Sequence, residues 1–225
     1  MRKLFVMFTS LMLLAGVATA SPLTDYSAGK VSVDLDWRNT ELQGDYDGTY
    51  AIDFKKKYSL DAGLTIGLGN NFAVQYNVFN PTPKTTALPD FLGDPFTGRL
   101  SSRQYNLMYR FNPEFAVYTG VMHANGSFKD LDWPAIYANT HTRDIWQFGL
   151  VASTKLGSKA TGYGMIGVGR DLTNWVAGIS FAVAPDTELN LSYRDLKINH
   201  FVTTSAGARL DSEASGFGAG ITYKF

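Results

Sequence analysis

Polar, charged and glycine residues recur at every second position along several stretches of this chain, with apolar residues between them. Around Asp34 and Asp36, the intervening positions are Val33, Leu35 and Trp37. Side chains of an extended strand alternate between its two faces, so this spacing collects the charges on one face. Charges gathered in this way either pair with one another or stand in water, because an isolated charge in low-dielectric surroundings is costly. The residues expected on this polar, inward face are Lys30, Asp34, Asp36, Asp61, Arg110, Lys155, Glu188, Arg194 and Lys224.

The side chains best suited to acid–base catalysis are three histidines in or near polar connections. A His–Asp pair, with further acidic residues, can activate water for peptide hydrolysis. No local motif specifies that reaction here, and we expect no catalytic residues and no enzymatic activity. The histidines are His123, His141 and His200, and the aspartates available to them are Asp130, Asp132 and Asp144.

Two short motifs mimic cofactor or metal sites. Residues 162–167 spell the glycine pattern of dinucleotide-binding folds, but no helix-forming sequence follows them. Asp45 begins a stretch like a calcium loop, yet Tyr50 stands where that loop needs Gly and Lys56 where it needs Glu. The sequence therefore predicts neither cofactor nor metal, and its formal net charge of +0 gives no indication of nucleic-acid binding.

Ten alternating segments supply the strands that would position these residues. Tight turns are predicted at 69–71, 112–114, 157–159 and 184–186, and long polar connections at 38–57, 80–102, 124–144 and 197–214. Short and long connections alternate, except for the short link 170–173. This pattern predicts an up-and-down antiparallel barrel of ten strands, with eight as the alternative. The predicted strands are 29–37, 58–68, 72–78, 103–111, 115–123, 145–156, 161–169, 174–183, 188–196 and 216–225.

The N-terminus has the features of a secretory signal. Arg2 and Lys3 precede an apolar run from Leu4 to Val17, and residues 18–20 have the small-x-small form of a cleavage site. We expect residues 1–20 to be removed and residues 21–225 to form one barrel domain. Without Arg2 and Lys3, the mature chain has 18 of the 20 basic residues and all 20 acidic residues, which gives a net charge of −2. With no Cys in the chain, a lipid anchor on the mature N-terminus is excluded.

Aromatic residues sort to the two ends of the predicted strands. Those near the long connections are Trp37, Tyr58, Tyr105, Trp146 and Trp175, and those near the tight turns are Phe72, Phe111, Phe115, Tyr223 and Phe225. Two such rows are typical of the aromatic girdles that anchor a barrel at both lipid headgroup layers. Packing in a soluble β-sandwich gives no reason for this sorting.

The C-terminal strand alternates apolar residues and ends on an aromatic. This ending resembles the C-terminal signature of bacterial outer-membrane β-barrels, and the chain resembles small porin-like members of that class. The residues that carry this assembly signal are Phe217, Ile221, Tyr223 and Phe225. The resemblance implies location in the bacterial outer membrane with both termini periplasmic. It also implies contact with outer-membrane lipid and recognition of the last strand by the barrel-assembly machinery.

The inward face leaves two functions open. Many inward positions are glycine, which we expect to widen the lumen into a narrow aqueous channel for small solutes, without strong ion preference. The alternative is a lumen plugged by salt bridges, in a structural or surface-interaction barrel that binds partners through its long outer loops.

Overall fold

The computed structural model describes residues 25–46, 50–87, 95–130, 137–203 and 209–225. These ranges contain no helix long and apolar enough to cross a membrane. They form eleven strands: β1 (Val31–Tyr46), β2 (Tyr50–Gly69), β3 (Phe72–Phe79), β4 (Thr86–Ala87), β5 (Pro95–Arg110), β6 (Phe115–Asp130), β7 (Tyr137–Lys155), β8 (Ala160–Gly169), β9 (Leu172–Ala184), β10 (Thr187–Thr203) and β11 (Arg209–Lys224).

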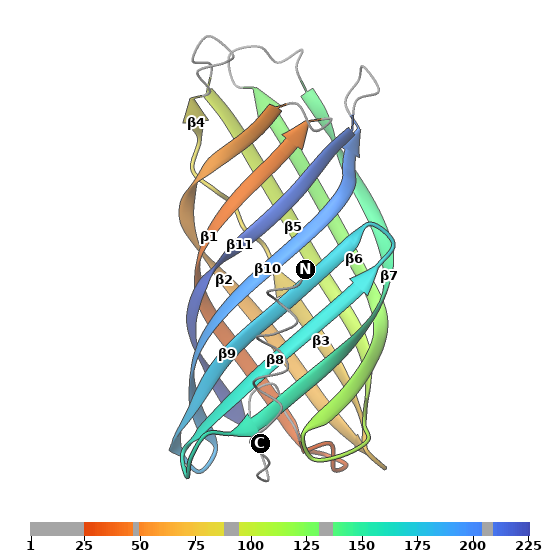
Figure 1. Cartoon of the computed structure of the whole chain (residues 1–225), viewed down its shortest axis with the longest axis vertical. Helices are drawn as coiled ribbons and strands as arrows, with labels where there is room; N and C mark the ends of the chain where they lie inside the picture. The colour runs from red at the N-terminus through yellow and green to blue at the C-terminus, as the bar shows by residue number, and fades with distance from the viewer. Residues whose placement is uncertain (1–24, 47–49, 88–94, 131–136, 204–208) are drawn as a thin grey trace.

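The strands close into one antiparallel barrel (Figure 1). The sheet runs β3-β2-β1-β11-β10-β9-β8-β7-β6-β5-β4, and the pairing of β3 with β5 joins its two ends. Strands β3 and β4 occupy one position in the wall, because Phe79 pairs with Ser102 and Thr86 with Phe96, both on β5. The described wall is therefore ten strands around, which confirms the predicted fold, and the eight-stranded alternative is not found.

Most strands extend well beyond their predicted ends, so the predicted long connections are wrong in extent. β1 continues past Trp37 to Tyr46, and β2 begins at Tyr50 instead of residue 58. The same holds for much of 80–102, 124–144 and 197–214. Glu41, for example, still pairs with Ser215 on β11. The backbone ladder continues there although the apolar alternation has stopped, and the prediction followed the alternation alone.

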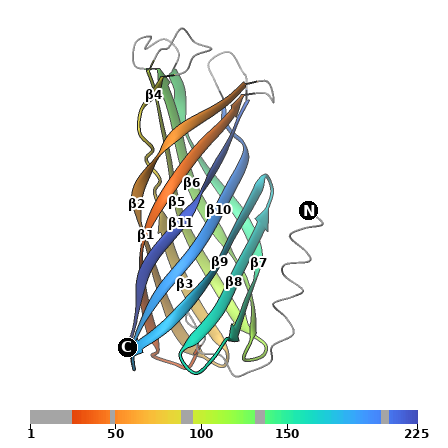
Figure 2. The same cartoon turned by 60° about the vertical axis from the view of Figure 1, so that its left-hand side comes forward.

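The two ends of the barrel differ. The predicted tight turns gather at the lower end in Figure 1, beside the C-terminus, and we call this end the short-turn rim. Asn70 and Asn71 have φ of 52° and 66°, a conformation that Asn adopts more readily than most residues. At the opposite end, the hairpin rim, the strands rise as long hairpins. The β8–β9 hairpin turns early, at Arg170–Asp171, and is lower than its neighbours β7 and β10 (Figure 2).

The outward face of β2 changes from apolar to polar beyond Tyr58. On β2, Tyr58, Leu60 and Leu68 are 67%, 48% and 51% exposed, whereas the exposed residues just beyond Tyr58 are Lys55, Lys56 and Lys57. From Tyr58 to Leu68, about ten residues rising ~3.3 Å each with a tilt of ~40° span roughly 25 Å. That is the height of the apolar band on outer-membrane barrels.

The predicted aromatic rows lie on this outward face. The exposed members are Trp37, Tyr58, Tyr105 and Trp146 at one edge of the band, and Phe72, Phe111, Tyr223 and Phe225 at the other; Trp175 and Phe115 are half-buried. Phe217 and Ile221 also point outward and are exposed. Their placement matches the prediction, while their roles in membrane anchoring and assembly stay predictions.

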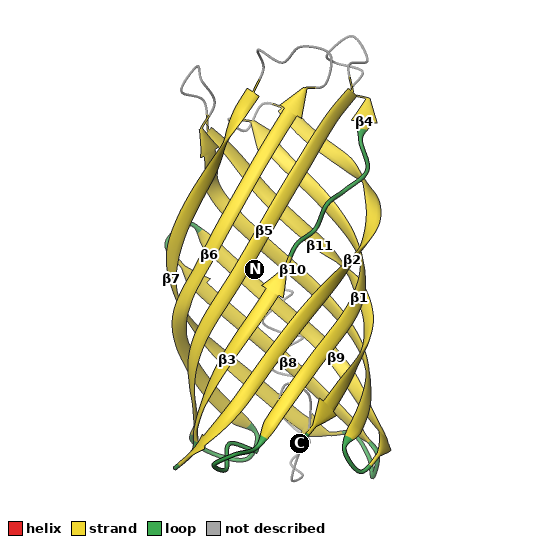
Figure 3. Cartoon of the chain, turned by 180° about the vertical axis from the view of Figure 1, so that it is seen from behind, coloured by secondary structure: helices red, strands yellow, loops and turns green. Residues whose placement is uncertain are grey.

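The wall has one interruption. The β2–β3 ladder ends at the pair Ala62–Val78, and the chain from Asn80 to Thr85 then follows β5 (Figure 3). The Leu100 amide donates to the Pro81 carbonyl at 3.2 Å, and beyond this point Lys84 donates to the Lys55 carbonyl at 3.1 Å. Within the described residues, no other backbone hydrogen bond ties 80–85 to β2. We call this interruption the seam.

Candidate functional site

The middle of the lumen is organised around Arg38, which is 2% exposed. Its Nε donates to Asp61 Oδ2 at 2.7 Å, its Nη1 to the Gly216 carbonyl at 3.0 Å and its Nη2 to Ser192 Oγ at 3.0 Å. Gly218 makes room for it, because a Cβ there would lie 3.0 Å from the Arg38 Cζ. Arg38 was assigned to an outer connection by the sequence, and this assignment is wrong: its inward parity continues that of Asp34 and Asp36.

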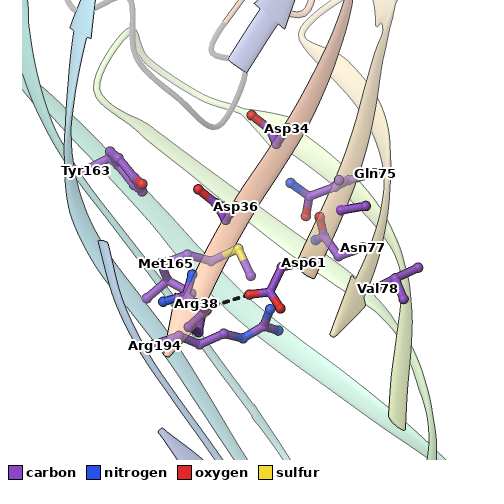
Figure 4. A pocket seen from close by; sticks show the side chains of 13 residues that line it. Asp34, Asp36, Arg38, Asp61, Gln75, Asn77, Val78, Tyr163, Met165 and Arg194 are labelled. Carbon is purple, nitrogen blue, oxygen red and sulfur yellow. Dashed lines mark hydrogen bonds and ion pairs between the residues drawn. The ribbon is translucent and has the colours of Figure 1, made fainter. Parts of the chain in front are cut away.

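A polar cavity of about 90 Å³ adjoins this ion pair (Figure 4). Asp34, Asp36, Asp61, Tyr163 and Arg194 are among its lining residues. Asp36 Oδ1 and Asp61 Oδ1 have no hydrogen-bond partner within the described residues. The space is large enough for a few water molecules, and its polar lining suits them.

A row of polar side chains on neighbouring strands, from β2 to β7, continues this layer around the inner wall. Gln147 Nε2 donates to Asn106 Oδ1 at 2.8 Å, Asn106 Nδ2 to Gln75 Oε1 at 3.1 Å, and Gln75 Nε2 to Thr65 Oγ1 at 3.4 Å. These side chains are all buried. The amides were not singled out from the sequence, although their alternation with apolar residues was the available signal.

Towards the short-turn rim the lumen is closed by an apolar layer that includes Tyr26. Tyr26 precedes β1, is 2% exposed, and its hydroxyl donates to Met108 Sδ at 3.7 Å. Its carbonyl accepts from the Gly69 amide at 2.8 Å, and the Arg110 guanidinium lies 5.5 Å from its ring centroid. Tyr26 thus lies in the barrel mouth. The layer consists of Tyr26, Ala73, Met108, Ala116, Tyr118, Val151 and Met165.

Towards the hairpin rim a larger apolar layer fills the lumen. Its members are no more than 3% exposed: Leu42, Phe54, Phe79, Leu100, Met122, Ala124, Ile145, Leu172, Leu196, Ile198, Phe201 and Ala214. Phe201 packs on Gly126, where a Cβ would lie 2.2 Å from its ring. The Arg194 guanidinium lies 4.4 Å from the Phe79 ring centroid and joins this layer to the polar one.

The inward glycines do not widen the lumen, contrary to expectation. A Cβ on Gly149 or Gly167 would lie 2.2 Å or 2.1 Å from the Tyr118 side chain, and one on Gly178 would lie 2.6 Å from Tyr163. Each of these glycines leaves a hollow that a large side chain from elsewhere in the wall occupies. Small inward residues therefore accompany a filled lumen here.

The predicted inward charges divide into three groups. Asp34, Asp36, Asp61, Glu188 and Arg194 lie in the lumen, and Lys224 bonds Glu188. Arg110 lies at the mouth over Tyr26. Lys30 and Lys155 are exposed at the short-turn rim, so their assignment to the lumen lining is wrong: Lys30 precedes β1 and Lys155 ends β7, where the wall no longer encloses them.

Above the short β8–β9 hairpin, polar contacts join β7 to β10. Arg143 Nη1 donates to the carbonyls of Asn199 and His200 at 3.2 and 3.1 Å, and its Nη2 to Asp171 Oδ2 at 3.2 Å. His200 Nδ1 lies 3.5 Å from Asp171 Oδ1. Hydrogen bonds from Arg143 and His200 hold the pKa of Asp171 below its usual value, although slight desolvation opposes them. These contacts close the gap that the short hairpin leaves.

The histidines do not assemble a catalytic centre in the described residues. His123 Nδ1 lies 2.6 Å from Asp144 Oδ1, but both side chains are on the outward face, one step above the apolar band. His200 contacts Asp171 in the β7–β10 link. The side chain of His141 and the predicted partner Asp132 are outside the described residues.

No protein-family model and no curated protein sequence matches the chain. Among solved structures, the outer membrane protease OmpT from Escherichia coli matches with a TM-score of 0.53 and 10% identity, over 87% of this chain and 97% of that one. Ail, the attachment invasion locus protein of Yersinia pestis, gives 0.40 and 14%, over 88% and 99%. Neisserial surface protein A gives 0.40 and 16%, over 88% and 99%. At such identities the OmpT likeness shows the barrel fold alone.

Proposed function

We propose that this protein is an integral outer-membrane barrel with a filled lumen, which acts through its outward surface and hairpin rim and not as a channel. Its short-turn rim and both termini face the periplasm, and its hairpins stand outside the cell. The C-terminal strand, with Phe217, Ile221, Tyr223 and Phe225 outward, serves as the signal for barrel assembly. The roughly 25 Å apolar band between two aromatic rows supports the placement in a membrane.

One observation carries the choice between the two functions that the sequence left open. The lumen holds two apolar layers with a hydrogen-bonded polar layer between them. The side chains of the apolar layer nearer the hairpin rim, called the upper layer, are at most 3% exposed. An ion would have to displace packed side chains in both apolar layers to pass. The filled lumen therefore supports the surface-interaction function over the porin-like one.

Planar-bilayer recording tests this proposal. The refolded protein is expected to give no steady openings, while heat-modifiable migration on a gel shows that it is folded. A variant that empties the upper layer, Phe54→Ala with Phe79→Ala and Phe201→Ala, serves as a matched comparison and is expected to leak. Steady openings from the folded wild type would contradict a filled lumen and restore the channel function.

A further inference from the structure

The outward face formed by β2, β3 and β5 carries an apolar groove of about 410 Å³. Two rows of paired residues form it, Ile66–Val74–Leu107 and Leu64–Tyr76–Tyr105. The Tyr76 and Tyr105 rings lie 5.0 Å apart at one end of the groove. The groove lies within the apolar band, so its natural occupant is a hydrocarbon chain.

Exposed cations lie beyond the groove, towards the hairpin rim, on β2, β5 and the segment Asn80–Thr85. Arg103 follows Tyr105 at the next outward position of β5, and Arg99 is four residues further along the same strand. Lys84, on the adjacent chain segment, pairs with Lys55 of β2, where Lys56 and Lys57 follow. The chain turns away from β2 at the seam and so brings these cations from three neighbouring segments together.

The local charge is positive among the described residues. Lys55 and Lys84 make other contacts and Lys56 pairs with Glu41, which leaves Lys57, Arg99 and Arg103 against Asp53, an excess of two positive charges (three minus one). Glu41 lies 3.0 Å from Lys56. Two and three strands from β2, β11 and β10 carry Asp195, Asp211 and Glu213 among their half-buried residues, with Lys197 3.9 Å from Glu213. An anion in the outer headgroup layer is thus attracted to the β2–β5 face.

We propose that this face binds a membrane lipid whose headgroup carries a phosphate. The inference rests on the proposed membrane placement. The acyl chain lies in the groove against Tyr105 and Val74. The phosphate is held by Arg103 and Arg99, whose guanidinium forks suit phosphate oxygens, with Lys57 supplying further charge. Basic clusters beside a membrane-spanning segment favour anionic headgroups in this way.

Competition between lipids in one nanodisc tests the site. The protein is assembled with equal amounts of phosphatidic acid and phosphatidylcholine of the same acyl chains, extracted in mild detergent, and its retained lipid counted by native mass spectrometry. Phosphatidic acid is expected to exceed phosphatidylcholine by at least about fivefold, the effect of a single Lys or Arg near an anionic surface. Equal retention of the two lipids would overturn the proposal.

Matched variants locate the effect. Lys57→Gln with Arg99→Gln and Arg103→Gln is expected to abolish the preference. A control of equal charge change at the short-turn rim and β8–β9 turn, Lys155→Gln with Lys159→Gln and Arg170→Gln, is expected to keep it. Val74→Trp fills the groove and lowers retention of phosphatidic acid. An unchanged preference in the first variant would overturn the assignment.

The proposed function and the lipid site fail in distinguishable ways. A protein that does not insert into either lipid, judged by the loss of heat-modifiable migration, would overturn the membrane placement and the site together. A protein that inserts but retains both lipids equally would overturn the site alone.

Discussion

Replacing Arg38 with Met is expected to destabilise the barrel by about 3–5 kcal/mol, the usual cost of removing one partner from a buried ion pair. The variant loses three hydrogen bonds, to Asp61, Gly216 and Ser192. It also leaves the Asp61 carboxylate without the hydrogen bond to its Oδ2, while its Oδ1 has no hydrogen-bond partner among the described residues. Single domains are commonly stable by only 5–15 kcal/mol, so the loss is a large share of the total.

Urea unfolding of the protein in phosphatidylcholine vesicles, followed by the fluorescence of its four tryptophans, measures this loss. The double variant Arg38→Met with Asp61→Leu is expected to recover part of it, because the carboxylate that would be left unpaired is removed as well. Lys159→Met, in an exposed turn, is the control and is expected to change stability by less than about 0.5 kcal/mol. A loss below about 1 kcal/mol for Arg38→Met would refute the view that this ion pair organises the lumen.

Three further outcomes are expected. Gly167→Val should destabilise the barrel by about 1–3 kcal/mol through overpacking, because a Cβ there would lie 2.1 Å from the Tyr118 hydroxyl and would contact only side chains. Tyr118→Ala in the same chain should relieve that clash. Urea unfolding of the single and double variants checks both, and an unaffected Gly167→Val barrel would mean that the tyrosine does not occupy this hollow. In vesicles, Leu191→Arg in the middle of the apolar band should lower the free energy of unfolding by about 2–4 kcal/mol, whereas Gln43→Arg beyond the band should change it very little. Equal losses in the two variants would mean that the apolar band does not lie where we place it. The folded-state pKa of Asp171 is lowered, so the stabilisation that its carboxylate contributes is present above the ordinary Asp pKa of about 4 and is lost as the pH falls through the lowered pKa. Hydrogen exchange of the backbone amides in the β7–β10 link should therefore accelerate on acidification in the wild type. The acceleration should be smaller in Asp171→Asn, and an equal one would contradict this role of the carboxylate.

The number of strands and the direction of their side chains could be predicted because turns or polar stretches separate the runs in which apolar residues stand at every second position. Val33, Leu35 and Trp37 were assigned outward and Asp34 and Asp36 inward, as observed. The strand ends could not be predicted in the same way. Beyond Trp37 both faces of β1 carry polar residues, so the amphipathic signal stops while backbone pairing continues to Tyr46.

The filling of the lumen depends on contacts across the barrel, which no local pattern encodes. A glycine such as Gly167 has the same local sequence whether it faces water or a tyrosine ring. That Tyr118 occupies the hollow is decided by the register of β6 with β7 and of β7 with β8. For β8 itself both parities are small and apolar, and only the structure assigns Tyr163 and Met165 to the inside.

The seam gives the barrel a mechanical weak point. A cylindrical sheet resists widening because each strand is bonded on both sides, and tension around the ring is shared by all the ladders. At the height of Lys57–Leu60, the bonding of β2 to its neighbour is interrupted between the pair Ala62–Val78 and the bridge Lys55–Lys84. We therefore expect radial strain on the hairpin rim to concentrate there and to separate β2 from Asn80–Thr85 before any other pair of neighbours in the described wall.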